Sequence, residues 1–241
     1  MFNPHPVIRA VPLPGHAPCL VIDDFLREPE HMLAFATARR SAFAVEGGNY
    51  FPGPEVGMPE QFSAQLAQFF ILHVRRHLGA RRTLEVTSRL SMVTKAPAEL
   101  HPLQRICHSD TMVGRRRVDP EAGEGIAASV LYLFQDAQLG GTSFYAPRKG
   151  PADMAQLNRD AQTLPGPAFD AIIGGPPAYL AGSNAYFEQI GTVPAAFNRV
   201  IFYDGAMLHS GQIDQPALLN ADPGKGRLTL NGFFLHRRAA A

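Results

Sequence analysis

His108 and Asp110 lie two residues apart in the segment Cys107-His108-Ser109-Asp110. In an extended chain, side chains at this spacing point to the same side, so the segment presents an imidazole nitrogen and a carboxylate oxygen together. Two such groups can bind one metal ion, but a stable site needs a third ligand. Far along the chain, His209 follows a strand-like run and supplies a second imidazole. Two histidines and one carboxylate are typical ligands of a non-haem Fe(II) centre.

The His-x-Asp pair is a weak signal when it is taken alone. The chain has nine histidines and 21 acidic residues, so about one such pair is expected by chance. A lone histidine is more often hydrogen-bonded within the structure, and Asp110 alone could cap a turn. His101 is a competing ligand, but it has no partner at a suitable spacing. The predicted elements around these residues are therefore needed to distinguish metal ligands from residues with local structural roles.

Length and composition predict one domain over residues 1–241. Hydrophobic residues make up 46% of the chain, which is enough for a sizeable core. The net charge of +1 gives no field that would attract nucleic acid or an anionic membrane. Two cysteines cannot form a disulfide framework, and the N-terminal stretch lacks the apolar run of a signal peptide. We therefore predict a cytoplasmic protein with no nucleic-acid or membrane partner, and we leave the oligomeric state open.

Helical periodicity dominates the first third of the chain. A helix is expected over residues 28–40, and a second over 59–78, where apolar residues recur at helical spacing. Pro59 suits the first turn of the second helix and Gly79 suits its end. Together they predict helical support over about residues 27–80, packed against a sheet.

Strand patterns dominate from residue 84 onwards. The expected strands cover residues 84–88, 90–94, 126–134, 140–145, 198–203, 207–213 and 227–235. The run 126–134 is nearly apolar, which favours a central position in a sheet. Between these strands, residues 146–197 form an insertion, with helices expected near 152–161 and 184–189. We expect the insertion to cover the mouth of the site, and an outer structural appendage is the alternative.

The last expected strand carries a second candidate site. Arg227, Thr229 and Asn231 alternate with aliphatic residues and therefore share one face of the sheet. A guanidinium group beside a hydroxyl group is suited to binding a carboxylate, because both donate hydrogen bonds. A solvated outer face is the alternative interpretation.

Taken in order, these segments resemble the 2-oxoglutarate- and Fe(II)-dependent oxygenases, and among them the prolyl-4-hydroxylase-like branch. The family order of His-x-Asp, a distant His and Arg-x-Ser/Thr is matched by His108, Asp110, His209, Arg227 and Thr229. Residues 130–133 and 140–142 are similar to the Tyr-Leu strand and Gly-Gly-x-Thr turn of the family, and residues 21–26 to its opening segment. Two features depart from the pattern. Arg227 lies further beyond His209 than usual, and the strand that leads to His108 lacks the tyrosine that relatives often have near the cosubstrate, although Tyr132 could replace it.

The resemblance implies a mainly β fold with flanking helices, a double-stranded β-helix of the jelly-roll, cupin-like kind. It implies Fe(II) bound by His108, Asp110 and His209, and 2-oxoglutarate bound through its distal carboxylate by Arg227, Thr229 and Tyr132. With O₂, such an enzyme hydroxylates an unactivated C–H bond of a small-molecule, amino-acid or peptidyl substrate and releases succinate and CO₂.

Other functions remain open beside this expectation. Asp110 occupies the position that a halogenase of this superfamily leaves open for halide, so hydroxylation is favoured. A cupin-like metal-binding protein that does not use 2-oxoglutarate, and an inactive binding module derived from an oxygenase, are the two alternatives.

Overall fold

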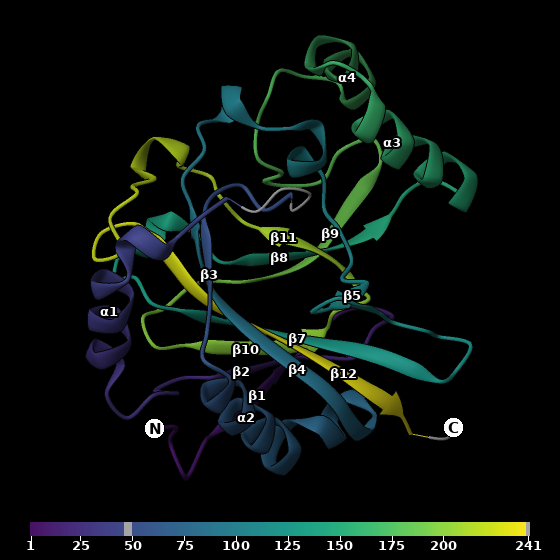
Figure 1. Ribbon diagram of the computed structural model, residues 1–241. Helices are drawn as coiled ribbons and strands as arrows, with labels where there is room; N and C mark the ends of the chain where they lie inside the picture. The colour runs from purple at the N-terminus through teal and green to yellow at the C-terminus, as the bar shows by residue number, and fades with distance from the viewer. Residues whose placement is uncertain (46–49, 240–241) are drawn as a thin grey trace.

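The computed structural model describes residues 1–45 and 50–239. Its larger sheet has seven antiparallel strands in the order β1-β2-β10-β7-β12-β4-β3 (Figure 1). These strands are β1 (Ile8–Val11), β2 (Cys19–Ile22), β3 (Glu55–Gly57), β4 (Ala80–Val93), β7 (Glu124–Tyr132), β10 (Val200–Asp204) and β12 (Arg227–Arg238). The nearly apolar run predicted to be central is β7, which lies between β10 and β12.

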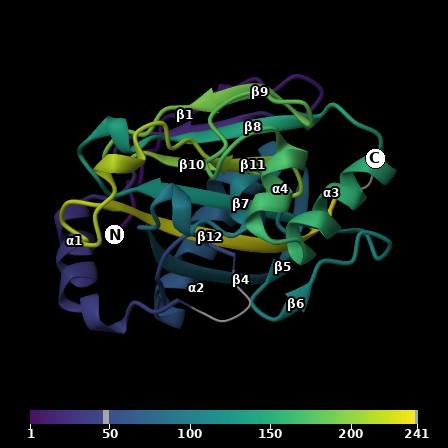
Figure 2. The same ribbon diagram turned by 90° about the horizontal axis from the view of Figure 1, so that it is seen from above.

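A smaller antiparallel sheet faces the larger one. It has the order β11-β8-β9 and comprises β8 (Thr142–Pro147), β9 (Phe187–Val193) and β11 (Leu208–Gly211). Figure 2 shows β8, β9 and β11 lying above β7, β12 and β4. Side chains from both sheets, such as Tyr132, Phe144 and Tyr203, form a buried cluster between them. Two facing antiparallel sheets around one core make a jelly roll, and the predicted fold class is confirmed.

Helices cover the outer face of the larger sheet. They are α1 (Pro29–Ala38) and α2 (Glu60–Phe69), and α2 continues into a π-helical turn, η2 (Phe70–Val74), and a 3₁₀ turn, η3 (Arg75–Leu78). Aromatic and aliphatic side chains join them to the sheet, and the rings of Phe70 and Phe234 stack 4.3 Å apart. The predicted helices at 28–40 and 59–78 are therefore present, although the second changes its winding after Phe69. Residues 46–49, within the predicted helical support, lie outside the described part of the chain.

Strand β12 separates two environments. Leu228, Leu230 and Phe234 contact the core beneath the helices, whereas Thr229 lies directly opposite the inward-facing Tyr132 of β7. Arg227, Thr229 and Asn231 are 4%, 1% and 9% exposed. The alternative of a solvated outer face is therefore wrong, because the smaller sheet and its loops cover this side as well.

The region 146–197 contains two helices and one strand. The helices are α3 (Pro151–Thr163) and α4 (Gly166–Ile173), which lie at one end of the molecule beside the smaller sheet (Figure 1). The helix expected near 152–161 is present as α3. The helix expected at 184–189 is wrong, because Phe187 begins β9 and the chain pairs there with β8. Backbone pairing with a neighbouring strand overrides the local pattern.

Short elements complete the described structure. They are the hairpin β5 (Met112–Val113) and β6 (Arg116–Arg117) and the 3₁₀ turns η1 (Arg40–Ala42), η4 (Pro97–Glu99), η5 (Pro102–Arg105), η6 (Ala137–Leu139) and η7 (Pro216–Leu218). Within residues 1–45 and 50–239, no helix has both the length and the apolar character needed to cross a membrane.

Candidate metal centre

Backbone hydrogen bonds bring the three predicted metal ligands together. His108 and Asp110 lie on the loop after η5, and His209 lies on β11. The amide of His108 donates to the carbonyl of His209 at 3.0 Å, and the reverse bond is 2.8 Å long. The amide of Asp110 donates to the carbonyl of Gly205, in the turn between β10 and β11, at 2.7 Å. The loop is thus held against β11 as a short extra strand would be.

The ligand atoms of these residues converge on one point. Nε2 of His209 lies 3.7 Å from Oδ2 of Asp110, and Nε2 of His108 lies 3.9 Å from Oδ1. Metal–ligand bonds are about 2.1 Å long, so two ligands of one ion lie no more than about 4.2 Å apart. Both imidazole–carboxylate pairs meet this limit, and all three ligand atoms lie within 4.8 Å of one another. Among the described residues, this is the group of histidine, cysteine and acidic side chains that could hold a metal ion.

The protonation of His209 suits a metal ligand. Its Nδ1 lies 2.8 Å from the carbonyl oxygen of Met207, which can only accept, so we assign the proton to Nδ1. The lone pair of Nε2 then faces Asp110. Burial lowers the pKa of His209 to about 4, so the ring is neutral at physiological pH.

Asp110 provides the clearest sign that a cation fits here. Its Oδ2 is buried and has no hydrogen-bond partner among the described residues. Burial raises the pKa of this carboxyl to about 6, and the nearby His108 and Arg89 partly offset the increase. An unpartnered buried carboxylate oxygen is costly, and a bound cation would compensate for that cost. The donor set therefore fits a divalent metal ion.

His108 marks the open side of the centre. Its side chain is 61% accessible, whereas those of Asp110 and His209 are 11% and 7% accessible. Enclosure by the protein and the neighbouring His209 lower the pKa of His108, but water at this exposed ring offsets part of that effect. Small molecules can therefore reach the centre beside His108, while protein covers the other two ligands.

The predicted carboxylate-binding residues lie deeper between the sheets. Arg227 donates from Nε to the carbonyl of Leu139 at 3.0 Å and from Nη2 to the carbonyl of Gly141 at 2.8 Å. A Cβ atom on Gly211 would lie 3.4 Å from Nη2 of Arg227. Gly211 is two residues beyond His209 on β11, so it points to the same side as that ligand. The guanidinium of Arg227 and the metal ligand are thus neighbours along the interior.

Tyr132 and Thr229 lie on the same interior face. They are directly opposite each other on β7 and β12. The hydroxyl of Tyr132 is 2.8 Å from that of Thr142, and the hydroxyl of Thr229 donates to the carbonyl of Ser91 at 3.4 Å. The structure therefore brings all six predicted site residues into the space between the sheets.

His101 does not join the metal group. Its Nδ1 accepts a hydrogen bond from the amide of Leu103 at 3.2 Å, and its ring lies 5.0 Å from that of Tyr50. The imidazole thus caps η5, a local role that explains its position beside the His-x-Asp segment.

Sequence reasoning missed a polar row on β4. Arg89 and Ser91 point to the same side as Asn231 of β12, and Ser91 donates to Oε1 of Glu55 at 2.6 Å. The alternation of side chains over residues 84–94 could have placed Arg89 and Ser91 on one face of a single strand. The prediction instead gave two strands, 84–88 and 90–94, separated at Arg89. A charged residue was taken as an interruption of the strand, whereas its side chain points inward.

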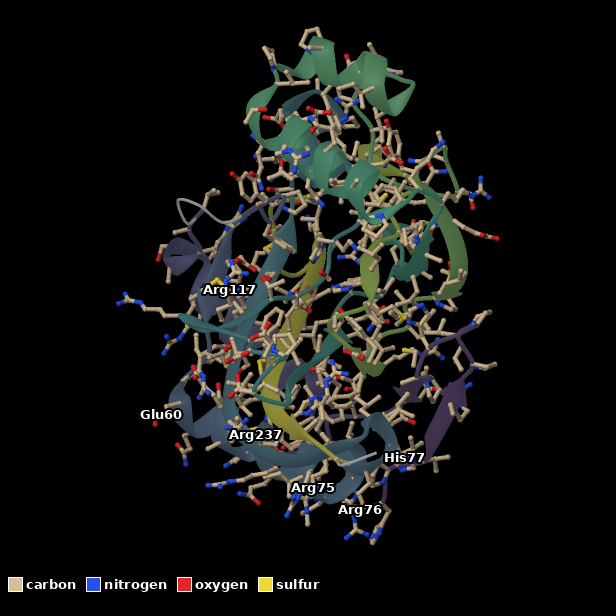
Figure 3. All side chains as sticks on the ribbon, turned by 90° about the vertical axis from the view of Figure 1, so that its right-hand side faces the viewer. Glu60, Arg75, Arg76, His77, Arg117 and Arg237 are labelled. Carbon is tan, nitrogen blue, oxygen red and sulfur yellow. The ribbon has the colours of Figure 1, made fainter. Side chains whose placement is uncertain are left out.

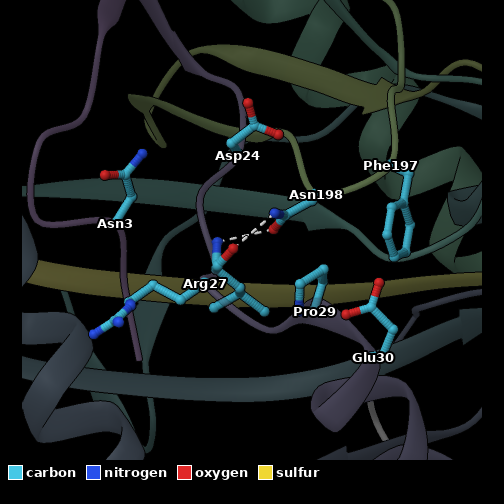
Figure 4. Close-up of a pocket in the computed structure, with 8 residues that line it drawn as sticks. Asn3, Asp24, Arg27, Pro29, Glu30, Phe197 and Asn198 are labelled. Atoms are coloured by element: carbon cyan, nitrogen blue, oxygen red, sulfur yellow. Dashed lines mark hydrogen bonds between the residues drawn. The ribbon is translucent and has the colours of Figure 1, made fainter.

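A hollow of about 550 Å³ lies away from this centre (Figure 4). Asn3, Asp24, Arg27 and Phe197 are among the residues that line it. The amide group of Asn198 at its edge accepts from the backbone of Leu26 at 2.8 Å and donates to it at 2.9 Å. This pair of bonds fastens two loops together, and none of the metal-binding group lines the hollow. We therefore do not assign the site to it.

Several solved structures are similar in fold at low sequence identity. HygX from Streptomyces hygroscopicus with nickel and 2-oxoglutarate bound is 13% identical, with a TM-score of 0.49 over 92% of this chain and 82% of that one. A Pseudomonas putida prolyl-4-hydroxylase is 14% identical, with a TM-score of 0.47 over 94% and 95%. The α-ketoglutarate-dependent carbocyclase SnoK from nogalamycin biosynthesis is 14% identical, with a TM-score of 0.49 over 92% and 79%.

Comparison of the sequence with families gives a match over nearly the whole chain. No curated protein matches it significantly. The model of a family of unknown function, DUF6445, matches residues 4–234. The chain therefore belongs to the DUF6445 family.

Proposed function

We propose that this chain is a single-domain Fe(II)- and 2-oxoglutarate-dependent oxygenase that hydroxylates a C–H bond of a small-molecule, amino-acid or peptidyl substrate. The observation that carries the proposal is the convergence of His108, Asp110 and His209 around a buried, unpartnered carboxylate oxygen. His108, Asp110 and His209 would hold the iron, which would supply the chemistry by which O₂ oxidises 2-oxoglutarate to succinate and CO₂ and hydroxylates the substrate, one oxygen atom going to succinate and the other to the substrate. The protein residues bind, orient and shield the reactants.

Arg227 supports the use of a dicarboxylate cosubstrate. Its side chain is buried, and burial lowers its pKa. Among the described residues, no carboxylate pairs with it, and the carbonyl oxygens of Leu139 and Gly141 accept hydrogen bonds from it. A buried cation without a counter-ion is unfavourable, so an anion delivered by a ligand would be bound strongly there. The distal carboxylate of 2-oxoglutarate meets this need.

The remaining residues fix the direction of the cosubstrate. With the distal carboxylate at Arg227, the 2-oxo acid end would lie on the side of Gly211 and His209. A Cβ atom on Gly211 would lie 3.4 Å from Nη2 of Arg227, so a larger residue there would take up space beside the guanidinium group. The hydroxyl groups of Thr229 and Tyr132 line the same face and can donate to the carboxylate. Asp110 would be the third protein ligand of the metal, which favours hydroxylation over halogenation.

A metal-binding and turnover experiment tests the proposal. Purified protein should bind one equivalent of Fe(II) and slowly form succinate from 2-oxoglutarate and oxygen. His108→Ala should lose both properties, because it removes a ligand. Its melting temperature should stay close to that of the metal-free wild type, because the ring is largely exposed.

His101→Ala is the matched control. This nearby histidine is outside the metal group, so the variant should retain iron and succinate formation. Equal loss of iron in both variants, or a wild-type protein that binds no iron, would contradict the proposal.

A further inference from the structure

Arg89 occupies an interior position that the metal centre and Arg227 leave unused. It lies on β4 opposite Asn231 of β12 on one side and Gly57 of β3 on the other. It therefore shares the interior face with Thr229 and Asn231. Asn231 is four residues beyond Arg227 on β12, or on the order of 13 Å of strand. Arg89 and Arg227 thus lie at different levels of the interior and can serve separate anions.

Two neighbours fix the direction of the Arg89 side chain. Its Nε lies 2.9 Å from Oε1 of Glu55, whose side chain is 4% accessible. Its guanidinium carbon lies 4.6 Å from the centre of the Phe233 ring. Ser91 holds the carboxylate of Glu55 from the other side. An arginine fixed by a carboxylate and an aromatic ring loses little entropy when it binds a ligand.

Arg89 still has donors available for a ligand. Its side chain is 38% accessible, and no hydrogen bond joins either terminal nitrogen to another described residue. A Cβ atom on the opposite Gly57 would meet no described atom within 4 Å. An anionic group can therefore approach the guanidinium from the edge formed by β3.

Arg89 lies near the segment that carries two of the proposed metal ligands. Its guanidinium group contacts the ring of Phe233, and Phe233 packs against the cluster that contains Val113, three residues beyond Asp110. Of these two ligands, His108 is the exposed one. A molecule bound to Arg89 would lie beside the open side of the metal centre.

We propose that Arg89 binds a carboxylate of the substrate, positioned by Glu55 and Phe233, and that the substrates are therefore carboxylic acids. This inference rests on the proposed function. A guanidinium donates two parallel hydrogen bonds to a carboxylate, an arrangement that neither an amide nor an ester reproduces. Arg89 would then set the distance between the carboxylate and the C–H bond that reacts.

The test uses the full chain with redox-inert Ni(II) and 2-oxoglutarate, so that no turnover occurs. Binding of N-acetyl amino acids is measured by calorimetry, and each acid is compared with its C-terminal amide. We expect at least one acid to bind ten times more tightly than its amide. Arg89→Gln should weaken binding of that acid at least tenfold and leave binding of Ni(II) and 2-oxoglutarate unchanged.

Two further variants control for folding and for general charge. Arg89→Lys keeps the charge without the planar pair of donors, so it should bind the acid less tightly than wild type and still bind 2-oxoglutarate. This variant carries the test where Arg89→Gln does not fold. Arg76→Gln removes an exposed arginine at the far end of the molecule (Figure 3) and should change nothing.

Two results would overturn the inference. One is that no acid binds wild type more tightly than its amide. The other is that Arg89→Gln weakens 2-oxoglutarate and spares the acid, which would assign Arg89 to the cosubstrate. Failure of the proposed function gives a different signature, because wild type would then bind neither Ni(II) nor 2-oxoglutarate.

Discussion

The buried carboxyl group of Asp110 lowers the stability of the metal-free fold and also attracts a cation. A carboxyl with a pKa of about 6 is unfavourable to ionise in the metal-free fold. The same burial strengthens its attraction for a cation, because little water screens the pair. On the proposed function, the metal-free protein is less stable because of this buried carboxylate, and metal binding restores the stability.

This balance predicts a pH-dependent effect of Asp110→Asn on the metal-free protein. The folded-state pKa of Asp110, about 6, exceeds the ordinary value of 3.8 for an aspartate, so protonation stabilises the fold, and this stabilisation is lost as pH rises from 4 to 6. Asparagine mimics the protonated form. Above pH 6 the variant should therefore be more stable than metal-free wild type by about 3 kcal/mol, and below pH 4 the difference should vanish.

Denaturant unfolding in the presence of a chelator measures this difference. The comparison with wild type removes the contribution of His209, which acts in the opposite direction in acid because its pKa is lowered. If the free energies of unfolding of the two proteins differed by a constant amount from pH 4 to 8, the pKa of Asp110 would not be raised in the metal-free fold, and the prediction would be wrong.

Some residues of the candidate site could be predicted from the sequence, and others could not. His108, Asp110 and His209 could be selected because their order along the chain, not the pair alone, matched a pattern. Arg89 could not, because its place in the interior depends on which strands pair with β4. The pairing of β4 with both β12 and β3 is a property of the whole sheet.

Among the elements, the strands with strongly apolar sequences were predictable, whereas the edge strand β9 was not. The runs that became β7, β10 and β12 are buried on both faces, so their apolar residues stand out. Strand β9 lies at the edge of the smaller sheet, and only Phe187 and Val193 of it are buried. Its sequence therefore carried little strand signal, and a helix was expected where it begins.

The helical insertion is tied to the metal loop through one buried arginine. The Arg105 side chain is 2% accessible and donates to Asp170 at 2.5 Å and to the carbonyl of Gly175 at 2.9 Å. Its guanidinium carbon also lies 5.4 Å from the Phe169 ring. Arg105 is three residues before His108, so α4 supports the loop that carries two of the proposed metal ligands.

Replacement of this arginine should loosen both segments together. Arg105→Met keeps apolar volume against Phe169 but removes the ion pair, and we expect a loss of about 3 kcal/mol. Hydrogen exchange should increase at residues 106–110 and 166–175 and stay nearly unchanged in β12. Asp170→Asn, which keeps an acceptor oxygen, should have a smaller effect. A uniform increase across all strands would contradict the coupling.

At the scale of the whole molecule, the two sheets create an interior with three polar levels. The metal ligands lie beside the exposed His108, Arg89 lies near them on β4, and Arg227 lies deeper on β12. The aliphatic faces of the same strands pack against α1 and α2. The core that holds the fold is thus separate from the space that holds the polar groups, so changes in that space need not unfold the protein.

The most direct test of the account is the absorbance of the anaerobic protein with Fe(II) and 2-oxoglutarate. We predict a weak visible charge-transfer band for wild type, which arises only when the 2-oxo acid binds the iron. Arg227→Lys should need at least tenfold more 2-oxoglutarate to produce it, and Arg76→Gln should behave as wild type. A folded, iron-loaded wild-type protein that shows no band at saturating 2-oxoglutarate would contradict the central claim.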